Sequence, residues 1–188
     1  MANVYSPSEF IKTCWSTLCT RLFNRPARLI RRPVYIRGRK GMSFGPGFTT
    51  GYGCRFEMFG EGPVLQIGTD CKLGDYVHIT ASQSVNVGDG CLFASNIFIS
   101  DTNHGNLQDD PTTPPDSRPL TAIPVAIGKN VWLGEGVAVL PGASIGDGCI
   151  IGAHAVVKGN IPPYTMAVGT PAKPVKRYNF ESKVWEHC

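Results

Sequence analysis

A repeat of six residues is the feature of the sequence that most limits its fold. Each unit starts with an aliphatic or aromatic side chain, often followed by Gly. Six consecutive units start at Ile127, Leu133, Val139, Ile145, Ile151 and Val157. Earlier units start at Ile67, Leu73 and Ile79 and, after a shift of two residues, at Val87, Phe93 and Ile99. A helix repeats every 3.6 residues and a strand every two, so a period of six predicts the short strands and corners of a parallel β-helix.

The fifth position of each unit is also small or aliphatic. These positions hold Cys71, Val77, Cys91, Ile97, Val131, Val137, Ala143, Cys149, Ala155 and Ile161. We therefore predict an all-β fold in which the first and fifth positions point inward and three of the cysteines fill the core. The seven cysteines form no C-x-x-C pair, which argues against a disulfide framework and against a zinc site.

The chain divides into three predicted segments. Residues 1–32 are a helical and basic segment, residues 33–170 the β-helix, and residues 171–188 a C-terminal tail. Within the β-helix, residues 101–124 interrupt the repeat with five prolines and four aspartates. Because this stretch cannot form a coil, we expect one long loop that protrudes from a corner. Long irregular segments on compact scaffolds are commonly functional.

The N-terminal segment predicts a short helix from a cap at Ser8 to about Arg28. Its apolar side chains share one side: Phe10, Ile11, Trp15, Leu18 and Leu22. Two interpretations are open, a helix that caps the open end of the β-helix or a peripheral contact with a membrane surface. The chain has neither a run of roughly 20 apolar residues nor a signal peptide, so we expect a cytoplasmic location. The net charge of +4 is too weak and too scattered to predict nucleic-acid binding.

Residues outside the simple repeat resemble a known family. They include the segments 99–105, 131–135, 43–49, 75–79, 117–120 and 169–178. Together with the repeat they resemble the hexapeptide-repeat (isoleucine-patch) acyltransferases, and within them the lipopolysaccharide (O-antigen) sugar O-acetyltransferases. The resemblance implies a left-handed β-helix, a homotrimer with active sites between subunits, acetyl-CoA as the acyl donor, no metal, and a sugar or lipid-linked glycan as the acceptor.

His104 is the predicted catalytic residue. A neutral imidazole accepts a proton near pH 7, and a positioned base contributes about 10²–10⁴-fold to the rate. Asp101 or a backbone carbonyl could orient the ring, and Asp101 is also among the residues expected to bind the acceptor. Asn103 is either a corner residue or an acceptor ligand. No Ser or Cys sits beside a histidine in a nucleophile motif, so we predict direct transfer without an acyl-enzyme.

The resemblance also implies where the thioester lies. The backbone N–H of Glu135 would stabilise the developing oxyanion. Relatives often carry a small residue there, so the Glu135 side chain must point away or make a new contact. The residues implied to line the pantetheine path are Gly134, Ala153, Lys158 and Gly159. Lys173 and Lys176 would meet the CoA phosphates, although ordinary solvated tail charge is an equal alternative.

His78 and Trp132 complete the expected site. His78 matches a position that contacts the acceptor in sugar acetyltransferases, against the alternative of a structural corner histidine. Trp132 either packs beside His104, stacks on a ligand, or belongs to the core.

Other functions remain to be weighed. A zinc-dependent hydratase on this fold needs three histidines, two commonly five residues apart, and the sequence has no H-x4-H. A non-catalytic scaffold is disfavoured by Asn103-His104 and the long loop. An acetyltransferase of free small sugars or of an antibiotic would keep the same chemistry with another acceptor.

Overall fold

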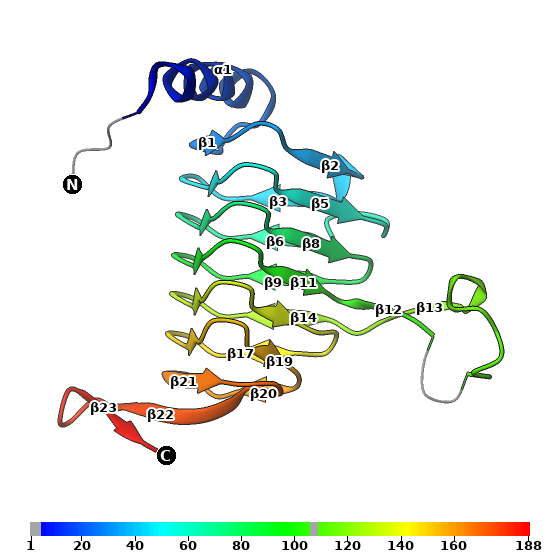
Figure 1. Cartoon of the computed structure of the whole chain (residues 1–188), viewed down its shortest axis with the longest axis vertical. Helices are drawn as coiled ribbons and strands as arrows, with labels where there is room; N and C mark the ends of the chain where they lie inside the picture. The colour runs from blue at the N-terminus through cyan, green and yellow to red at the C-terminus, as the bar shows by residue number, and fades with distance from the viewer. Residues whose placement is uncertain (1–4, 106–108) are drawn as a thin grey trace.

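A computed structural model describes residues 5–105 and 109–188 and shows a stack of β-coils with a helix at one end (Figure 1). Each coil contributes short strands to three parallel faces, here called A, B and C. The chain passes through A, B and C in turn, which defines an A–B, a B–C and a C–A corner. The predicted parallel β-helix is confirmed, and its left-handed winding stays a prediction.

The strands of each face pair in parallel. Face A holds β1 (Leu29–Ile30), β4 (Thr49–Thr50), β7 (Lys72–Leu73), β10 (Leu92–Phe93), β15 (Trp132–Leu133), β18 (Ile150–Ile151) and β21 (Thr165–Val168). Face B holds β2 (Tyr35–Arg37), β5 (Arg55–Met58), β8 (His78–Ala81), β11 (Phe98–Ser100), β16 (Ala138–Val139) and β19 (Val156–Val157). Face C holds β3 (Met42–Phe44), β6 (Leu65–Ile67), β9 (Val85–Val87), β14 (Val125–Ile127), β17 (Ser144–Ile145) and β20 (Asn160–Ile161). A short 3-10 helix, η1 (Arg39–Gly41), precedes β3.

The core is the inside of this prism. Every predicted first-position and fifth-position side chain of the repeat is buried, which confirms the inward-facing pattern. Residues at equivalent positions stack on one another, as where Leu133 pairs with Phe93 in one neighbouring coil and with Ile151 in the other. Cys71, Cys91 and Cys149 are among these buried side chains, as expected of small core residues.

The N-terminal helix is shorter than predicted. Helix α1 runs over Pro7–Phe23, and Ser6, not Ser8, caps it. The Ser6 hydroxyl accepts the Glu9 N–H while the Glu9 carboxylate accepts the Ser6 N–H, which is a capping box with a proline in the first turn. The helix ends at Phe23 because Asn24 caps it and a turn follows. The β-helix then begins at Leu29, inside the segment predicted to be separate.

The C-terminal tail continues face A in the opposite direction. Strand β22 (Lys173–Asn179) pairs antiparallel with β21, and β23 (Val184–His187) pairs antiparallel with β22. This hairpin lies at the end of the stack opposite α1 (Figure 1).

The interruption of the repeat forms the predicted protruding loop. Strands β12 (Thr102–His104) and β13 (Leu120–Ala122) pair antiparallel as a ribbon, with η2 (Pro115–Ser117) farther out. The ribbon leaves the B–C corner between β11 and β14 and extends sideways from the stack (Figure 1). It returns where the Ile123 N–H donates to the Asp101 carbonyl at 2.8 Å.

Asp101 anchors the exit of the loop. Its side chain is fully buried, and its oxygens accept the backbone N–H groups of Ser82, Gln83 and Ser84 at 2.8 to 3.1 Å. The Thr102 hydroxyl donates to Oδ1 at 2.7 Å. The hydrogen bonds to this carboxylate offset the cost of burying its charge, and hydrogen bonds to an ionised group are stronger than those to a neutral one.

We expect Val139→Ala to lower the free energy of unfolding by about 2 kcal/mol, because it removes two buried methyl groups and leaves a cavity. Urea unfolding followed by circular dichroism measures the effect. Val184→Ala is the matched control: Val184 is 51% exposed against 0% for Val139, so its change should stay within about 0.5 kcal/mol. Equal effects of the two substitutions would contradict the assigned core.

We expect Asp101→Asn to destabilise the protein by about 2 kcal/mol, because the amide nitrogen would face backbone donors that then lack an acceptor. The same urea titration measures it. Asp116→Asn on exposed η2 is the control and should change stability by less than about 0.5 kcal/mol. An unchanged midpoint for Asp101→Asn would show that the loop exit does not depend on this carboxylate.

Candidate active site

His104 lies at the end of β12, just outside the B–C corner. The side chain is exposed, and the residue pairs with Leu120 across the ribbon. The next residue is fixed on both sides, because the Gly105 N–H donates to the Pro119 carbonyl and the Gly105 carbonyl accepts the Thr121 hydroxyl. No described residue of the same chain makes a hydrogen bond with the His104 ring. The backbone next to His104 is therefore held by hydrogen bonds, and the imidazole is exposed.

The hypothesis that Asp101 orients His104 or binds the acceptor is wrong for this chain. The carboxylate is 0% exposed and is occupied by backbone N–H groups and the Thr102 hydroxyl. Sequence spacing missed this because Asp101 lies in the bend between β11 and β12, where its side chain meets the backbone N–H groups of the neighbouring coil. The alternative, a backbone carbonyl that orients the ring, stays a prediction.

Asn103 lies in the ribbon and not at a tight corner. It is exposed and pairs with Thr121 across the two strands. The corner interpretation of Asn103 is therefore wrong, and its role as an acceptor ligand stays a prediction.

His78 is held on the outer surface of face B by a charged cluster that the sequence analysis missed. Its Nε2 lies 3.1 Å from Oε2 of Glu57, a carboxylate that is only 6% exposed. The Arg55 guanidinium donates to both Glu57 oxygens, at 2.7 and 2.9 Å. These hydrogen bonds from Arg55, followed by that from His78, lower the pKa of Glu57. Glu57 is therefore an ionised acceptor at neutral pH, and a neutral His78 must donate from Nε2 and present Nδ1 as an acceptor.

Register explains why this cluster escaped detection. Arg55 pairs with His78 between β5 and β8, although 22 positions of sequence separate them. The only local signal is the spacing of Arg55 and Glu57 two residues apart, which places both side chains on one surface of a strand. Phe98, on the next strand, packs edge-on against the His78 ring with centroids 5.5 Å apart.

At the A–B corner of successive coils, side chains accept hydrogen bonds from backbone N–H groups, and we call this series of hydrogen bonds the ladder. The Tyr52 N–H donates to Asp75 Oδ1 at 2.7 Å, and the Asp75 N–H donates to Ser95 Oγ at 3.1 Å. The Ser95 N–H donates to Glu135 Oε2 at 2.9 Å. In each case the residue at the same corner of the next coil supplies the acceptor.

The ladder ends at Glu135. The equivalent residue of the next coil is Ala153, which has no polar side chain, so the Glu135 N–H has no acceptor among the described residues. The Glu135 side chain makes the new contact that the sequence required: besides the Ser95 N–H, it accepts the Asn96 amide at 2.6 Å. The carboxylate is thereby held toward the preceding coil, and it does not cover the N–H of its own residue.

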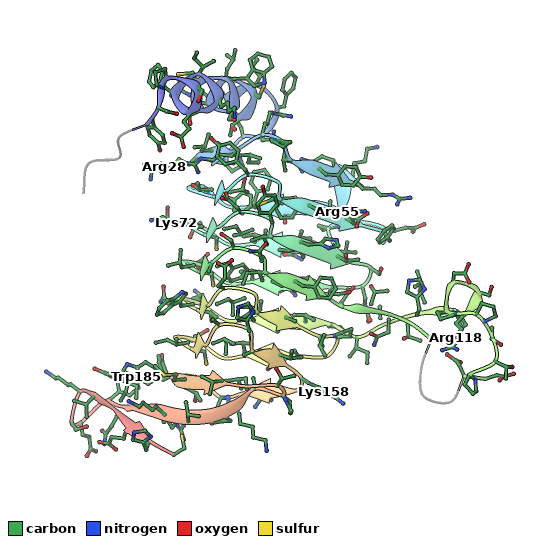
Figure 2. The ribbon with its side chains drawn as sticks, in the orientation of Figure 1. Arg28, Arg55, Lys72, Arg118, Lys158 and Trp185 are labelled. Atoms are coloured by element: carbon green, nitrogen blue, oxygen red, sulfur yellow. The ribbon has the colours of Figure 1, made fainter. Side chains whose placement is uncertain are left out.

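The remaining residues expected to contact CoA lie in three places. Gly134 and exposed Ala153 share the A–B corner with Glu135. Exposed Lys158 and Gly159 follow β19 at the B–C corner, and Figure 2 shows Lys158 on the side of the stack from which the loop leaves.

Lys173 and Lys176 lie on β22, where Lys173 is exposed and Lys176 half-buried. The Ala172 N–H donates to the Val156 carbonyl at 2.8 Å, which holds the start of β22 against the last strand of face B.

Two glycines of this set have structural reasons of their own. A Cβ at Gly134 would lie 2.7 Å from the Ala153 backbone nitrogen, so close stacking of coils already requires glycine there. Gly159 has a φ of +89° and open space around it, so its turn requires glycine while leaving room for a ligand.

Trp132 lies on the outer surface of face A and is 49% exposed, in register with Leu92 and Ile150. The interpretation of Trp132 as a core residue is therefore wrong. Packing beside His104 of the same chain is also wrong, because the ribbon leaves from the B–C corner and not from face A. Stacking on a ligand stays a prediction.

The predicted base and the predicted oxyanion donor do not converge within one chain. The unpaired Glu135 N–H is at the A–B corner, whereas His104 projects beyond the B–C corner, so the width of face B separates them. In the described part of the chain no group of three His, Cys, Asp or Glu side chains could hold a metal ion.

Comparison with known proteins agrees with this architecture. Residues 124–159 match the family described as "Bacterial transferase hexapeptide (six repeats)". Over 191 aligned residues, the chain is 44% identical to a protein of Escherichia coli K12 provisionally named lipopolysaccharide biosynthesis O-acetyl transferase WbbJ. That alignment covers 99% of this chain and 97% of the relative. The galactoside O-acetyltransferase of the same organism is 31% identical over 66% of this chain and 60% of its own.

Solved structures share the fold. AntD, an N-acyltransferase from Bacillus cereus crystallised with dTDP and coenzyme A, superposes with a TM-score of 0.70 and 19% identity, covering 97% of this chain and 94% of its own. A galactoside acetyltransferase in complex with coenzyme A superposes with a TM-score of 0.54 and 22% identity, covering 96% of this chain and 77% of its own. The repeat, the coiled fold and the full-length relationship lead to one conclusion: the chain belongs to the hexapeptide-repeat acyltransferase family.

Proposed function

We propose that the protein transfers an acetyl group from acetyl-CoA to a sugar hydroxyl during assembly of a surface polysaccharide such as an O-antigen. The observation that carries the proposal is the Glu135 N–H, which the corner ladder leaves without an acceptor just where the next coil offers only a methyl group. The kinship with WbbJ supports the choice of lipopolysaccharide chemistry. The reaction is expected on the cytoplasmic side of the membrane.

His104 acts as the general base. The imidazole takes the proton of the sugar hydroxyl as the hydroxyl oxygen forms its bond to the acetyl carbonyl carbon. The carbon–sulfur bond of the thioester then breaks, and the imidazolium returns its proton to the departing sulfur. The products are an acetyl ester and free CoA. The transfer is direct, without an acyl-enzyme. The two exposed cysteines do not lie next to His104 in the chain, because Cys14 is on α1 and Cys188 follows β23.

The Glu135 N–H stabilises the negative charge that develops on the thioester oxygen. A backbone donor held by its coil needs no reorganisation during the reaction, and such donors lower the activation barrier by about 3–4 kcal/mol. The preceding N–H groups of the ladder cannot do this, because each already donates to a side chain.

The active site is formed between two copies of the chain in a homotrimer. Because His104 and the Glu135 N–H lie at opposite edges of face B, a base from one copy must meet a corner from its neighbour. The sideways extension of the loop suits this arrangement (Figure 1). The pantetheine part of CoA would pass Gly134, Ala153, Lys158 and Gly159, with Lys173 and Lys176 near the phosphates.

The acceptor would lie along face B next to the loop. With Nε2 of a neutral His78 directed to Glu57, Nδ1 can accept a hydrogen bond from a sugar hydroxyl, and Asn103 is exposed on the ribbon. A sugar or lipid-linked glycan has the many hydroxyls that such groups recognise. Trp132, on face A, would stack on a ligand held by a neighbouring copy.

We expect His104→Ala to lower kcat by at least about 10²-fold while the dissociation constant for acetyl-CoA stays unchanged, because only proton transfer is lost. A CoA-release assay over a panel of sugars and lipid-linked oligosaccharides measures kcat, and calorimetry measures acetyl-CoA binding. His187→Ala on exposed β23 is the control and should retain activity. Full activity of His104→Ala would refute the role of the base.

We expect mixed oligomers of His104→Ala and Ala153→Glu to recover activity that neither variant has alone. Ala153→Glu would place a carboxylate on the Glu135 N–H as Glu135 does for Ser95, and would obstruct the thioester. Co-refolded subunits, purified with two different affinity tags, should then contain some sites that have both His104 and Ala153 intact. If each site belonged to one chain, the mixed oligomers would stay inactive.

A further inference from the structure

Helix α1 is docked with its polar side inward and its apolar side outward. The residues Ile11, Trp15, Leu18 and Leu22 follow the spacing of one helical stripe, and they are 67, 59, 51 and 65% exposed. Phe10 and Phe23 are also exposed. Side chains project from the outer side of α1, away from the stack (Figure 2). The helix does lie at the open end of the stack, as one of the two interpretations expected, but it turns its apolar side away from the coils.

The inward side of α1 is held by hydroxyl groups. The buried residues of the helix are Ser16, Cys19 and Thr20. The Thr20 hydroxyl accepts the Ile30 N–H at 2.9 Å, and the Ser16 hydroxyl accepts the Arg32 N–H at 3.1 Å. These bonds bind the helix to the first coil and fix its orientation. The outward orientation of the apolar stripe therefore follows from specific hydrogen bonds between the helix and the first coil.

Charge is segregated toward the same end. Residues 1–56 contain ten Lys and Arg and one acidic residue, Glu9, while residues 57–188 contain eight Lys and Arg and thirteen acidic residues. Arg21, Arg25 and Arg28 are exposed on α1 or just after it. The weak net charge of the whole chain hides this strongly basic end.

We propose that α1 and the basic residues around it bind the surface of an anionic lipid bilayer, with the helix parallel to the surface. In the part of the chain that the structure describes, no helix is long and apolar enough to cross a membrane. An apolar stripe edged by Lys and Arg is the pattern of helices that lie in the interface. Apolar burial and attraction to anionic headgroups then act together.

Charge favours a lipid surface over a second copy of the chain as the occupant. Two α1 stripes placed face to face would bring two strongly basic ends together, and like charges repel. An anionic bilayer neutralises them instead. Binding would orient the stack with its C-terminal hairpin away from the membrane (Figure 1).

The test uses full-length protein and sedimentation with vesicles, and it does not depend on acetyl transfer. We expect binding to vesicles of phosphatidylcholine with phosphatidylglycerol, and at least tenfold weaker binding to phosphatidylcholine alone. Binding should also weaken in roughly 1 M salt, where screening is strong. Leu18→Glu should reduce binding at least tenfold, because it places a charge in the stripe. Val184→Glu, an exposed substitution at the opposite end, is the matched control and should bind as the unaltered protein does.

Two exposed cysteines provide a second readout that needs no charged substitution in the apolar stripe. Cys14 lies on α1 and Cys188 after β23, and the other five cysteines are buried. A polarity-sensitive dye on Cys14, in a Cys188→Ser background, should shift to the blue when anionic vesicles are added. The same dye on Cys188, in a Cys14→Ser background, should not shift. Equal shifts at both cysteines, or equal binding to both kinds of vesicle, would overturn the proposal. So would a Cys14 dye that is already blue-shifted before vesicles are added, in a protein whose sedimentation shows twice the mass of the proposed trimer, because α1 would then pair with α1 of another copy.

Discussion

In-register stacking of the coils is the constraint on which the rest of the structure depends. Each coil hydrogen-bonds to the next through its backbone, so that equivalent side chains, such as Phe93, Leu133 and Ile151, lie directly over one another in the core. The same stacking fixes what happens outside. It places Arg55 beside His78, and it sets one corner residue under the N–H of another. Inserting or deleting one residue in any coil would shift this register and would therefore disturb both the core and the contacts at the corner.

The parts of the fold that repeat could be predicted from the sequence, because period and burial have the same cause. The six-residue spacing identified the inward positions, and the prolines of residues 101–124 identified the loop. The N-terminal helix was predicted with the wrong cap, since Ser6 and Ser8 are both plausible caps and only the pairing of Ser6 with Glu9 decides between them. Its orientation escaped prediction because an apolar stripe does not say which side faces the protein.

The candidate site shows the same division. His104 and the corner of Glu135 came from a motif, but their separation by face B depends on the path of the chain in space. Asp101 was a candidate to orient His104 because it lies close to it in sequence, yet the bend between β11 and β12 turns its side chain inward to backbone donors. Glu57 and Arg55 were missed because no short motif joins them to His78. Residues that act through register or through a second copy of the chain leave little trace in local sequence.

Among the described residues, the hydrogen bonds that join the loop to the stack lie at its two ends, around Asp101 and Ile123. Ile123 closes it by donating to the Asp101 carbonyl, and its own carbonyl accepts the Gly142 N–H in the next coil. Beyond this closure the ribbon and the outer residues are stabilised within the loop, as where Arg118 donates to the carbonyls of Thr113 and Pro111. The loop tip can therefore be exchanged in evolution without rebuilding any coil. Under the proposed function, changes at the loop tip would alter the choice of acceptor while the coils that would hold the thioester stay unchanged.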